Sequence, residues 1–247
     1  MTLLIKIVVL SLLLSACASA PVTGRQQLML VSESTTIELG NKAYRQSLES
    51  AKINGNGKYV AQVRRVGQYL ANVAERPDYA WEFNVIDDDK VVNAFALPGG
   101  KVAVYSGLLR LDLSDDELAA VMGHEIAHAI AQHSRERLSQ QMGLVMIMQV
   151  LGAAEQSPQS KALMNLALGI GVGLPFERRQ ESEADRIGLD LMVLAGYDPR
   201  AAISFWKKMQ RSGGKQPPAI LSSHPSDAKR IQDLEAALPG YVEQRGK

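Results

Sequence analysis

The segment 114–130 constrains the fold of this chain more than any other segment. Its apolar residues recur at helical spacing, and Ser114 with Glu117 three positions later is typical of a capping box at a helix start. Inside this predicted helix the sequence reads H-E-I-A-H from His124 to His128. Histidines at i and i+4 lie about 40° apart around a helix, so both imidazoles can reach one metal ion. The segment therefore predicts a helix that carries part of a metal site.

The motif matches the zinc-binding pattern H-E-x-x-H, in which the glutamate, here Glu125, acts as general base. A chance match in a chain of this composition is expected about 0.004 times, so we favour a metal site over two solvated histidines. A catalytic zinc also needs a third protein ligand and an open position for water. A second predicted helix, 181–195, begins with E-S-E-A-D and supplies carboxylates that can complete the site.

Composition excludes several other classes of function. The 247 residues are 46% hydrophobic and 21% charged, which is typical of a globular protein and not of a disordered or collagen-like chain. Lysine and arginine number 27 against 26 acidic residues, so the surplus of clustered cations that nucleic-acid binding needs is missing. Cys17 is the only cysteine, which excludes an internal disulfide and a cysteine-rich zinc site.

The first 16 residues are typical of a signal peptide. One cation, Lys6, precedes an apolar stretch that is too short to span a bilayer. The stretch ends in L-S-A-C at Cys17, which resembles the lipobox of bacterial lipoproteins, and by the same resemblance Ala18 favours the outer membrane. We expect a lipoprotein signal peptide at 1–16, a lipidated arm at 17–31 and a single domain at 32–247. The alternative is an ordinary signal peptide with an incidental cysteine.

The rest of the chain predicts an α+β domain that is predominantly helical and contains a small sheet. A capping box at Thr35 and Glu38 predicts the start of the first helix. The expected helices span 35–52, 59–75, 114–130, 142–151, 162–173, 181–195 and 199–210, with a last helix after Pro225. Three short strands are expected at 81–86, 91–97 and 102–105, the last two as a hairpin. We interpret 142–173 as core or as a lid, with membrane contact as the less favoured alternative.

Two further patterns accompany H-E-x-x-H: E-x-x-x-D from Glu181 to Asp185, and a hairpin sequence at 93–109. With these motifs, roughly residues 85–234 resemble the zinc metallopeptidase family of HtpX, BepA, Oma and the CAAX prenyl endoproteases. The resemblance implies a zincin-like (gluzincin) metallopeptidase domain, with an edge-strand hairpin before the active-site helix and one Zn²⁺ per chain. It also implies that His124, His128 and Glu181 bind the zinc and that Asp185 accepts an N–H from a ligand histidine. We expect a compact lipoprotein member, without the transmembrane helices of HtpX or the helical repeats of BepA.

Three other positions leave alternatives open. The family carries a similar His-Pro pair near the C-terminus, so His224 is either a fourth ligand or oxyanion stabiliser, or a helix-capping residue. His133 is predicted to lie about 140° around the helix from His128, away from the metal, and to be structural. Glu183 is predicted to lie on another helix face as a solvated carboxylate.

Together these patterns predict a lipid-anchored zinc endopeptidase on the periplasmic face of the outer membrane. Glu125 would take the proton of the metal-activated water and pass it to the leaving amine. Unfolded or misassembled envelope proteins are the expected substrates, held by strand addition along Asn93, Ala94, Phe95 and Ala96, for which an ordinary core hairpin is the alternative. A second hypothesis is an envelope chaperone or assembly factor, a partner of assembly machinery whose protease site is latched by His224. A membrane-bound scaffold is the weakest hypothesis.

Overall fold

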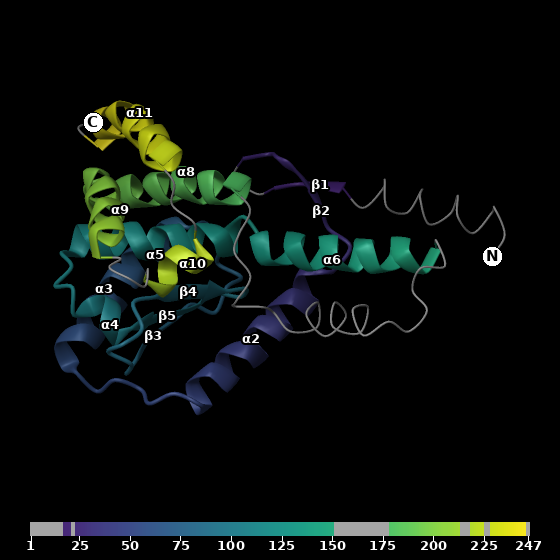
Figure 1. The fold of residues 1–247 in the computed structure, drawn as a ribbon, viewed down its shortest axis with the longest axis horizontal. Coiled ribbons are helices and arrows are strands. Elements are labelled where there is room, and N and C mark those ends of the chain that lie inside the picture. Colours follow the sequence, from purple (N-terminus) through teal and green to yellow (C-terminus); the bar gives the residue numbers. More distant parts are fainter. Residues whose placement is uncertain (1–16, 21–22, 151–177, 213–217, 225–227, 246–247) are drawn as a thin grey trace.

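The computed structural model describes residues 17–20, 23–150, 178–212, 218–224 and 228–245 (Figure 1). The signal peptide expected at 1–16, the helix expected at 162–173 and Pro225 lie outside these ranges. The helices are α2 (Glu33–Glu49), α3 (Gly57–Val73), α4 (Ser106–Leu109), α5 (Asp115–Ile130), α6 (His133–Val150), α8 (Arg178–Leu194), α9 (Arg200–Ser212), α10 (Ala219–Ser223) and α11 (Ala228–Arg245). The strands are β1 (Cys17–Ser19), β2 (Gln26–Leu28), β3 (Glu82–Ile86), β4 (Ala94–Leu97) and β5 (Lys101–Tyr105). The predicted helix-rich α+β class is confirmed.

The main sheet has the strand order β3-β5-β4. β4 and β5 form the predicted antiparallel hairpin, and β3 runs parallel to β5. The turn between β4 and β5 contains Gly99 and Gly100, whose φ angles of 87° and 82° lie in the region that favours glycine. Because β3 pairs with β5, β4 is left at an edge of the sheet.

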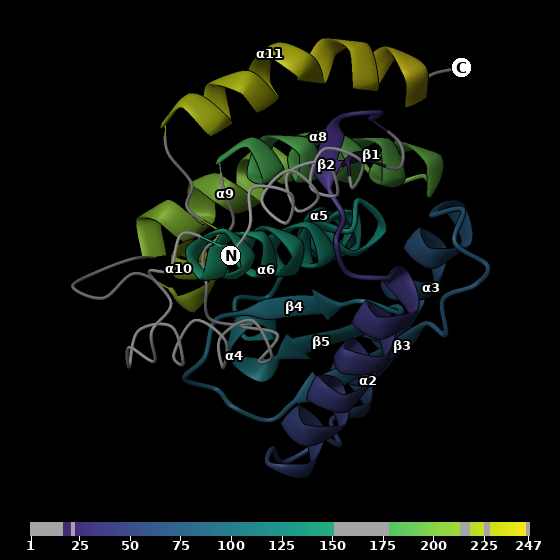
Figure 2. The same ribbon diagram turned by 90° about the vertical axis from the view of Figure 1, so that its right-hand side faces the viewer.

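The sheet lies between α2 on one face and α3 with α5 on the other (Figure 2). Side chains alternate along the strands, so each face belongs to a different apolar cluster. Val102 and Val104 of β5 pack in the cluster that contains α3 and α5, whereas Ala103 packs with Tyr44 of α2. α8 and α9 both pack on α5 away from the sheet, and α11 packs on the outside of α8 and α9. α5 is therefore enclosed by the sheet on one side and by helices on the other.

The burial of α5 follows from its sequence and from two glycines. The predicted capping box is present, with the Ser114 hydroxyl accepting from the Glu117 backbone N–H and the Glu117 carboxylate accepting from the Ser114 N–H. Every residue from Leu118 to Ile130 is buried. Gly123 of α5 faces Gly188 of α8 so closely that a Cβ on Gly123 would lie 3.3 Å from the Gly188 carbonyl oxygen. These glycines allow the two helix backbones to approach and bring their polar side chains together.

Three predicted helix starts are wrong: α8 begins at Arg178 and not at position 181, and α2 and α6 also begin earlier than expected. α2 begins at Glu33, because the hydroxyl of Ser32 accepts from the Thr35 backbone N–H at 3.1 Å and caps the helix three residues earlier than expected. α6 begins at His133 and not at position 142, directly after Gln132, whose φ of 59° ends α5. The first half of α6 is mostly polar: Arg135, Glu136 and Ser139 bond to the N-terminal arm, while Leu138 packs against Val31 of the same arm.

The N-terminal arm, expected at 17–31, folds back on itself in its described part. β1 and β2 pair antiparallel, and Gln27 is buried with its side-chain amide donating to the Ala131 carbonyl at 3.0 Å. The backbone N–H of Val31 donates to the Ser139 hydroxyl of α6 at 3.2 Å. Within the described ranges, no helix combines the length and apolar character needed to cross a membrane.

Candidate metal centre and active site

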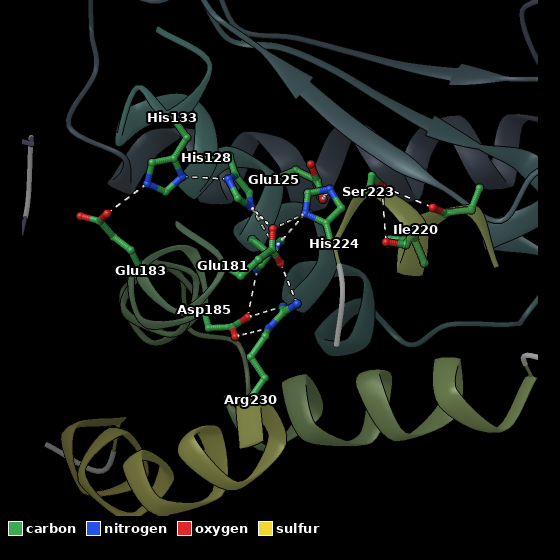
Figure 3. Close-up of polar contacts among 12 residues, drawn as sticks. Glu125, His128, His133, Glu181, Glu183, Asp185, Ile220, Ser223, His224 and Arg230 are labelled. Atoms are coloured by element: carbon green, nitrogen blue, oxygen red, sulfur yellow. Dashed lines mark hydrogen bonds and ion pairs between the residues drawn. The ribbon is translucent and has the colours of Figure 1, made fainter. Parts of the chain in front are cut away.

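Four buried side chains meet where α5, α8 and the end of α10 come together (Figure 3). The Nε2 atoms of His124 and His128 lie 3.1 Å apart, as the i and i+4 spacing on α5 requires. The Glu181 carboxylate of α8 lies 3.3 Å from each of these nitrogens. The fourth member, His224, follows α10, and one ligand atom from each of the four residues lies within 4.8 Å of the others.

The donor set fits one zinc ion. Imidazole nitrogens and a carboxylate oxygen are ligands that zinc accepts, and a catalytic site uses three protein ligands with a further position open. The three predicted ligands His124, His128 and Glu181 are each at most 2% exposed. The two Nε2 atoms are close enough either to share one proton or to bind one cation together. The structure thus brings the three predicted ligands together with the geometry that a metal needs.

Asp185 lies behind His124, the position that the family resemblance implied. Its Oδ1 lies 3.0 Å from the His124 Nδ1, on the side of the ring that faces away from the cluster. Burial lowers the pKa of His124, but the carboxylates of Asp185 and Glu181 outweigh burial and raise it to about 9. A metal must therefore displace a proton from this histidine, so metal binding weakens as the pH falls.

Arg230 of α11 is a functional residue that the sequence did not reveal. It donates to both carboxylate oxygens of Asp185, at 2.7 and 2.8 Å, and its Nη1 lies 2.6 Å from the Oε2 of Glu181. The guanidinium lies 4.4 Å from the centre of the Trp206 ring and is buried. One cation thus orients two buried carboxylates of the site. In the sequence Arg230 follows Lys229 at a helix start, where a solvated cation is the ordinary expectation.

The predicted general base Glu125 is buried between the ligands and the edge strand. Burial raises the pKa of its carboxyl, against the lowering effect of neighbouring histidines and of a backbone hydrogen bond from Ala96. A raised pKa suits a carboxylate that must accept a proton from water near neutral pH. Because Ala96 belongs to β4, the predicted substrate strand lies directly beside Glu125.

His224 has its ring inside the cluster (Figure 3). Its Nδ1 lies 3.0 Å from Glu181 Oε1 and 3.3 Å from His124 Nε2, and its Nε2 lies 3.2 Å from Glu125 Oε1. The residue is 2% exposed. This position is compatible with both the fourth-ligand role and the oxyanion role that the sequence left open.

The prediction for Glu183 is wrong. Glu183 is 6% exposed, and its Oε2 lies 3.1 Å from His133 Nε2 and 2.6 Å from Arg25 Nε, while its Oε1 accepts from the Thr23 hydroxyl. Burial raises the pKa of this carboxyl, but His133, Thr23 and Arg25 outweigh burial and lower it to about 2. Glu183 does lie on a different helix face from Glu181, but the N-terminal arm covers that face.

His133 lies outside the four-residue cluster, as predicted, but it is not remote from it. Its Nδ1 lies 2.8 Å from the Nδ1 of His128. The predicted angle of 140° assumed one continuous helix, whereas α5 ends before Gln132 and α6 starts at His133. The break returns the His133 ring to the rear of the ligand His128.

Comparison with known proteins agrees with this geometry. Residues 58–238 match the model of Peptidase family M48. The chain belongs to peptidase family M48. This membership confirms the predicted zinc metallopeptidase family, its zincin-like fold and its zinc cofactor. The site residues from Ala96 to Arg230 all fall within the M48 match, whereas Thr23 and Arg25 precede it.

Three relatives illustrate the similarity of this M48 chain. It is 42% identical to the mitochondrial metalloendopeptidase OMA1 of Schizosaccharomyces pombe over 179 residues, 72% of this chain and 52% of the relative. It is 30% identical to the OMA1 of Saccharomyces cerevisiae over 244 residues, 89% of this chain and 68% of the relative. It is 31% identical to the beta-barrel assembly-enhancing protease of Escherichia coli over 207 residues, 80% of this chain and 42% of the relative. The chain thus spans about half of the fission yeast relative.

Proposed function

We propose that this chain is a zinc endopeptidase with Glu125 as its general base. When bound by His124, His128 and Glu181, zinc lowers the pKa of a water ligand toward about 7 and polarises the scissile carbonyl. Glu125 accepts the proton of that water and passes it to the leaving amine. The observation that carries the proposal is the buried Glu125 carboxylate beside three correctly spaced zinc donors.

The test is Glu125→Gln in the full chain, loaded with zinc and incubated with fluorescently labelled casein as unfolded substrate. Loss of the base should lower the cleavage rate by about 10²- to 10⁴-fold while the bound zinc stays near one ion per chain. Glu38→Gln, at an exposed carboxylate of α2, is the control and should cleave like the parent. Cleavage by Glu125→Gln at the parental rate would exclude this mechanism.

We further propose that substrate binds as an added strand along β4, at Asn93, Ala94, Phe95 and Ala96. In the antiparallel ladder Tyr105 N–H donates to the Asn93 carbonyl, so the backbone groups of Ala94 and Ala96 face away from β5. The Ala96 bond to Glu125 brings this open edge to the catalytic carboxylate. A peptide paired here would lie with its backbone across the zinc site.

Ala94→Pro tests the added strand because proline removes one outward N–H from the edge. The variant should raise KM for casein several-fold and keep the parental zinc content, while the larger proline ring at the buried position of Ala94 lowers the melting temperature. An unchanged KM would contradict strand addition at this edge.

We propose that the protein acts in the bacterial cell envelope, held by a lipid on Cys17 at the periplasmic face of the outer membrane, on unfolded or misassembled proteins. The lipobox supports the anchor, and the similarity to the Escherichia coli protease supports the envelope, whereas the OMA1 relatives are named as mitochondrial. Expression with labelled palmitate in a two-membrane bacterium should label the parent but not Cys17→Ala. Equal labelling of both would contradict the anchor.

A second candidate function, an envelope chaperone or assembly factor with a latched protease site, is favoured by the position of His224. Its ring contacts both Glu181 and Glu125, where it competes with water and substrate. Faster casein cleavage by His224→Ala would support the latch. Slower cleavage would instead support an oxyanion-stabilising role and an active peptidase.

A further inference from the structure

A line of buried polar side chains leads from the ligand His128 to the N-terminal arm (Figure 3 shows its inner part). His128 Nδ1 lies 2.8 Å from His133 Nδ1, and His133 Nε2 lies 3.1 Å from the Oε2 of Glu183. Arg25 Nε then donates to the same Oε2 at 2.6 Å. His128, His133 and Glu183 are each at most 6% exposed. The four residues come from α5, α6, α8 and the arm.

Only one assignment of hydrogens satisfies every contact in this line when His128 binds a metal through Nε2. The neutral ring of His128 then carries its hydrogen on Nδ1, which donates to the Nδ1 of His133. His133 in turn carries its hydrogen on Nε2, which donates to Glu183. The carboxylate accepts from His133, from Thr23 and from Arg25. The line therefore fixes both the tautomer and the orientation of His128.

Arg25 determines whether the outer end of this line is held in place. Besides Glu183, it donates through both terminal nitrogens to Glu136 of α6, at 2.8 and 2.7 Å. Glu136 also accepts from the Gln180 side chain at 2.7 Å. One guanidinium thus ties α6, α8 and the arm together behind the metal site. Its own side chain is 17% exposed, so the contact depends on the arm staying docked.

We propose that Arg25 is a positioning residue of the zinc site and that docking of residues 23–28 of the arm is coupled to zinc binding. The inference rests on the proposed zinc site. Partners that orient a ligand histidine change metal affinity by about 10- to 100-fold when they are removed. Coupling between two binding events is reciprocal, so zinc must stabilise the docked arm by the same factor by which the arm strengthens zinc binding.

The experiment measures the Zn²⁺ dissociation constant of the folded chain by competition with a chromophoric chelator. Arg25→Gln should weaken zinc binding by about 10- to 100-fold, and Arg25→Lys, which keeps the charge, should recover part of the loss. Arg65→Gln is the control, because Arg65 makes a similar bidentate contact with Asp115 far from this line. The Zn²⁺ dissociation constant of Arg65→Gln should equal that of the parent.

Two further readouts separate positioning from general destabilisation. In Co²⁺-loaded protein the visible absorption bands, which report the ligand geometry, should shift in Arg25→Gln and in Glu183→Gln but not in Arg65→Gln. Zinc should slow hydrogen exchange of the β2 backbone amides in the parent. In Arg25→Gln this slowing should be smaller, by the same factor by which the zinc affinity has fallen.

An Arg25→Gln chain with parental zinc affinity and cobalt spectrum would overturn the inference, even if its melting temperature fell, because the arm would then be only structural. Failure of the parent itself to bind zinc would overturn the proposed function instead. The two failures are therefore distinguishable in one titration series.

Discussion

Gly188→Ala tests whether the close crossing of α5 and α8 sets the geometry of the zinc ligands. A Cβ at position 188 would lie 3.2 Å from the His124 backbone nitrogen and 3.3 Å from the Gly123 carbonyl carbon. Non-bonded heavy atoms prefer about 3.5–4.0 Å, so the two backbones must separate by a few tenths of an ångström. Glu181 lies on the same helix about two turns earlier, so it moves relative to His124.

The expected effect on folding is small, but the effect on metal binding is large. Overpacking costs about 1–3 kcal/mol, and replacing a helical glycine by alanine returns about 1 kcal/mol, which leaves a net loss of about 0–2 kcal/mol. Zinc sites tolerate ligand displacements of only about 0.2 Å. We therefore expect zinc affinity to fall about tenfold while most of the stability remains.

The assay combines chelator competition for zinc with urea unfolding of the metal-free chain. Gly240→Ala is the matched control, because Gly240 lies within α11 and a Cβ there meets no atom within 4 Å. It should gain up to about 1 kcal/mol in stability and keep its zinc affinity. The reasoning is refuted if Gly188→Ala behaves like Gly240→Ala in both measurements.

Three further predictions concern stability. Arg230→Gln leaves two buried carboxylates without their cation and should lower the free energy of unfolding by about 3–5 kcal/mol in urea titrations, whereas exposed Lys229→Gln should change it little. Ser114→Ala removes the cap of α5 and should cost about 0.5–2 kcal/mol in the same assay. Burial raises the pKa of Tyr79 to about 12. The contribution of its neutral hydroxyl to the free energy of unfolding is therefore complete below about pH 10 and is lost as the pH rises toward 12. In urea titrations of Tyr79→Phe, the free energy of unfolding should therefore fall less steeply above about pH 10, by about 1.4 kcal/mol per pH unit. A pH dependence equal to that of the parent would contradict this.

The parts of the site that the sequence predicted are those set by local geometry. His124, Glu125 and His128 lie on one capped helix, where a fixed spacing determines which side chains share a face. Glu181 was assigned through the E-x-x-x-D motif, whose meaning came from the resemblance to the metallopeptidase family. The hairpin of β4 and β5 was predictable because two glycines and two alternating segments specify it locally.

The features of the site that the sequence did not predict depend on tertiary contacts. Periodicity placed Glu183 on a separate face of its helix, but only the fold shows that Arg25 covers that face. His133 was assigned by extending α5 through Gln132, where the backbone instead turns. Arg230 reaches the site because α11 packs on α8, a contact that no local pattern encodes. Sequence periodicity identifies a helix face but not the element that covers it.

The position of His224 in the sequence determines when this site can form during synthesis. His124 and His224 contact each other across 100 positions of sequence, and Arg230 follows later still. A chain emerging from the ribosome can form α5 with both ligand histidines, but it cannot add His224 or Arg230 until synthesis has passed position 230. Contacts of such long sequence separation also slow folding. The complete cluster, with Arg230 behind it, therefore forms only after residues far apart in the sequence have been made and folded together.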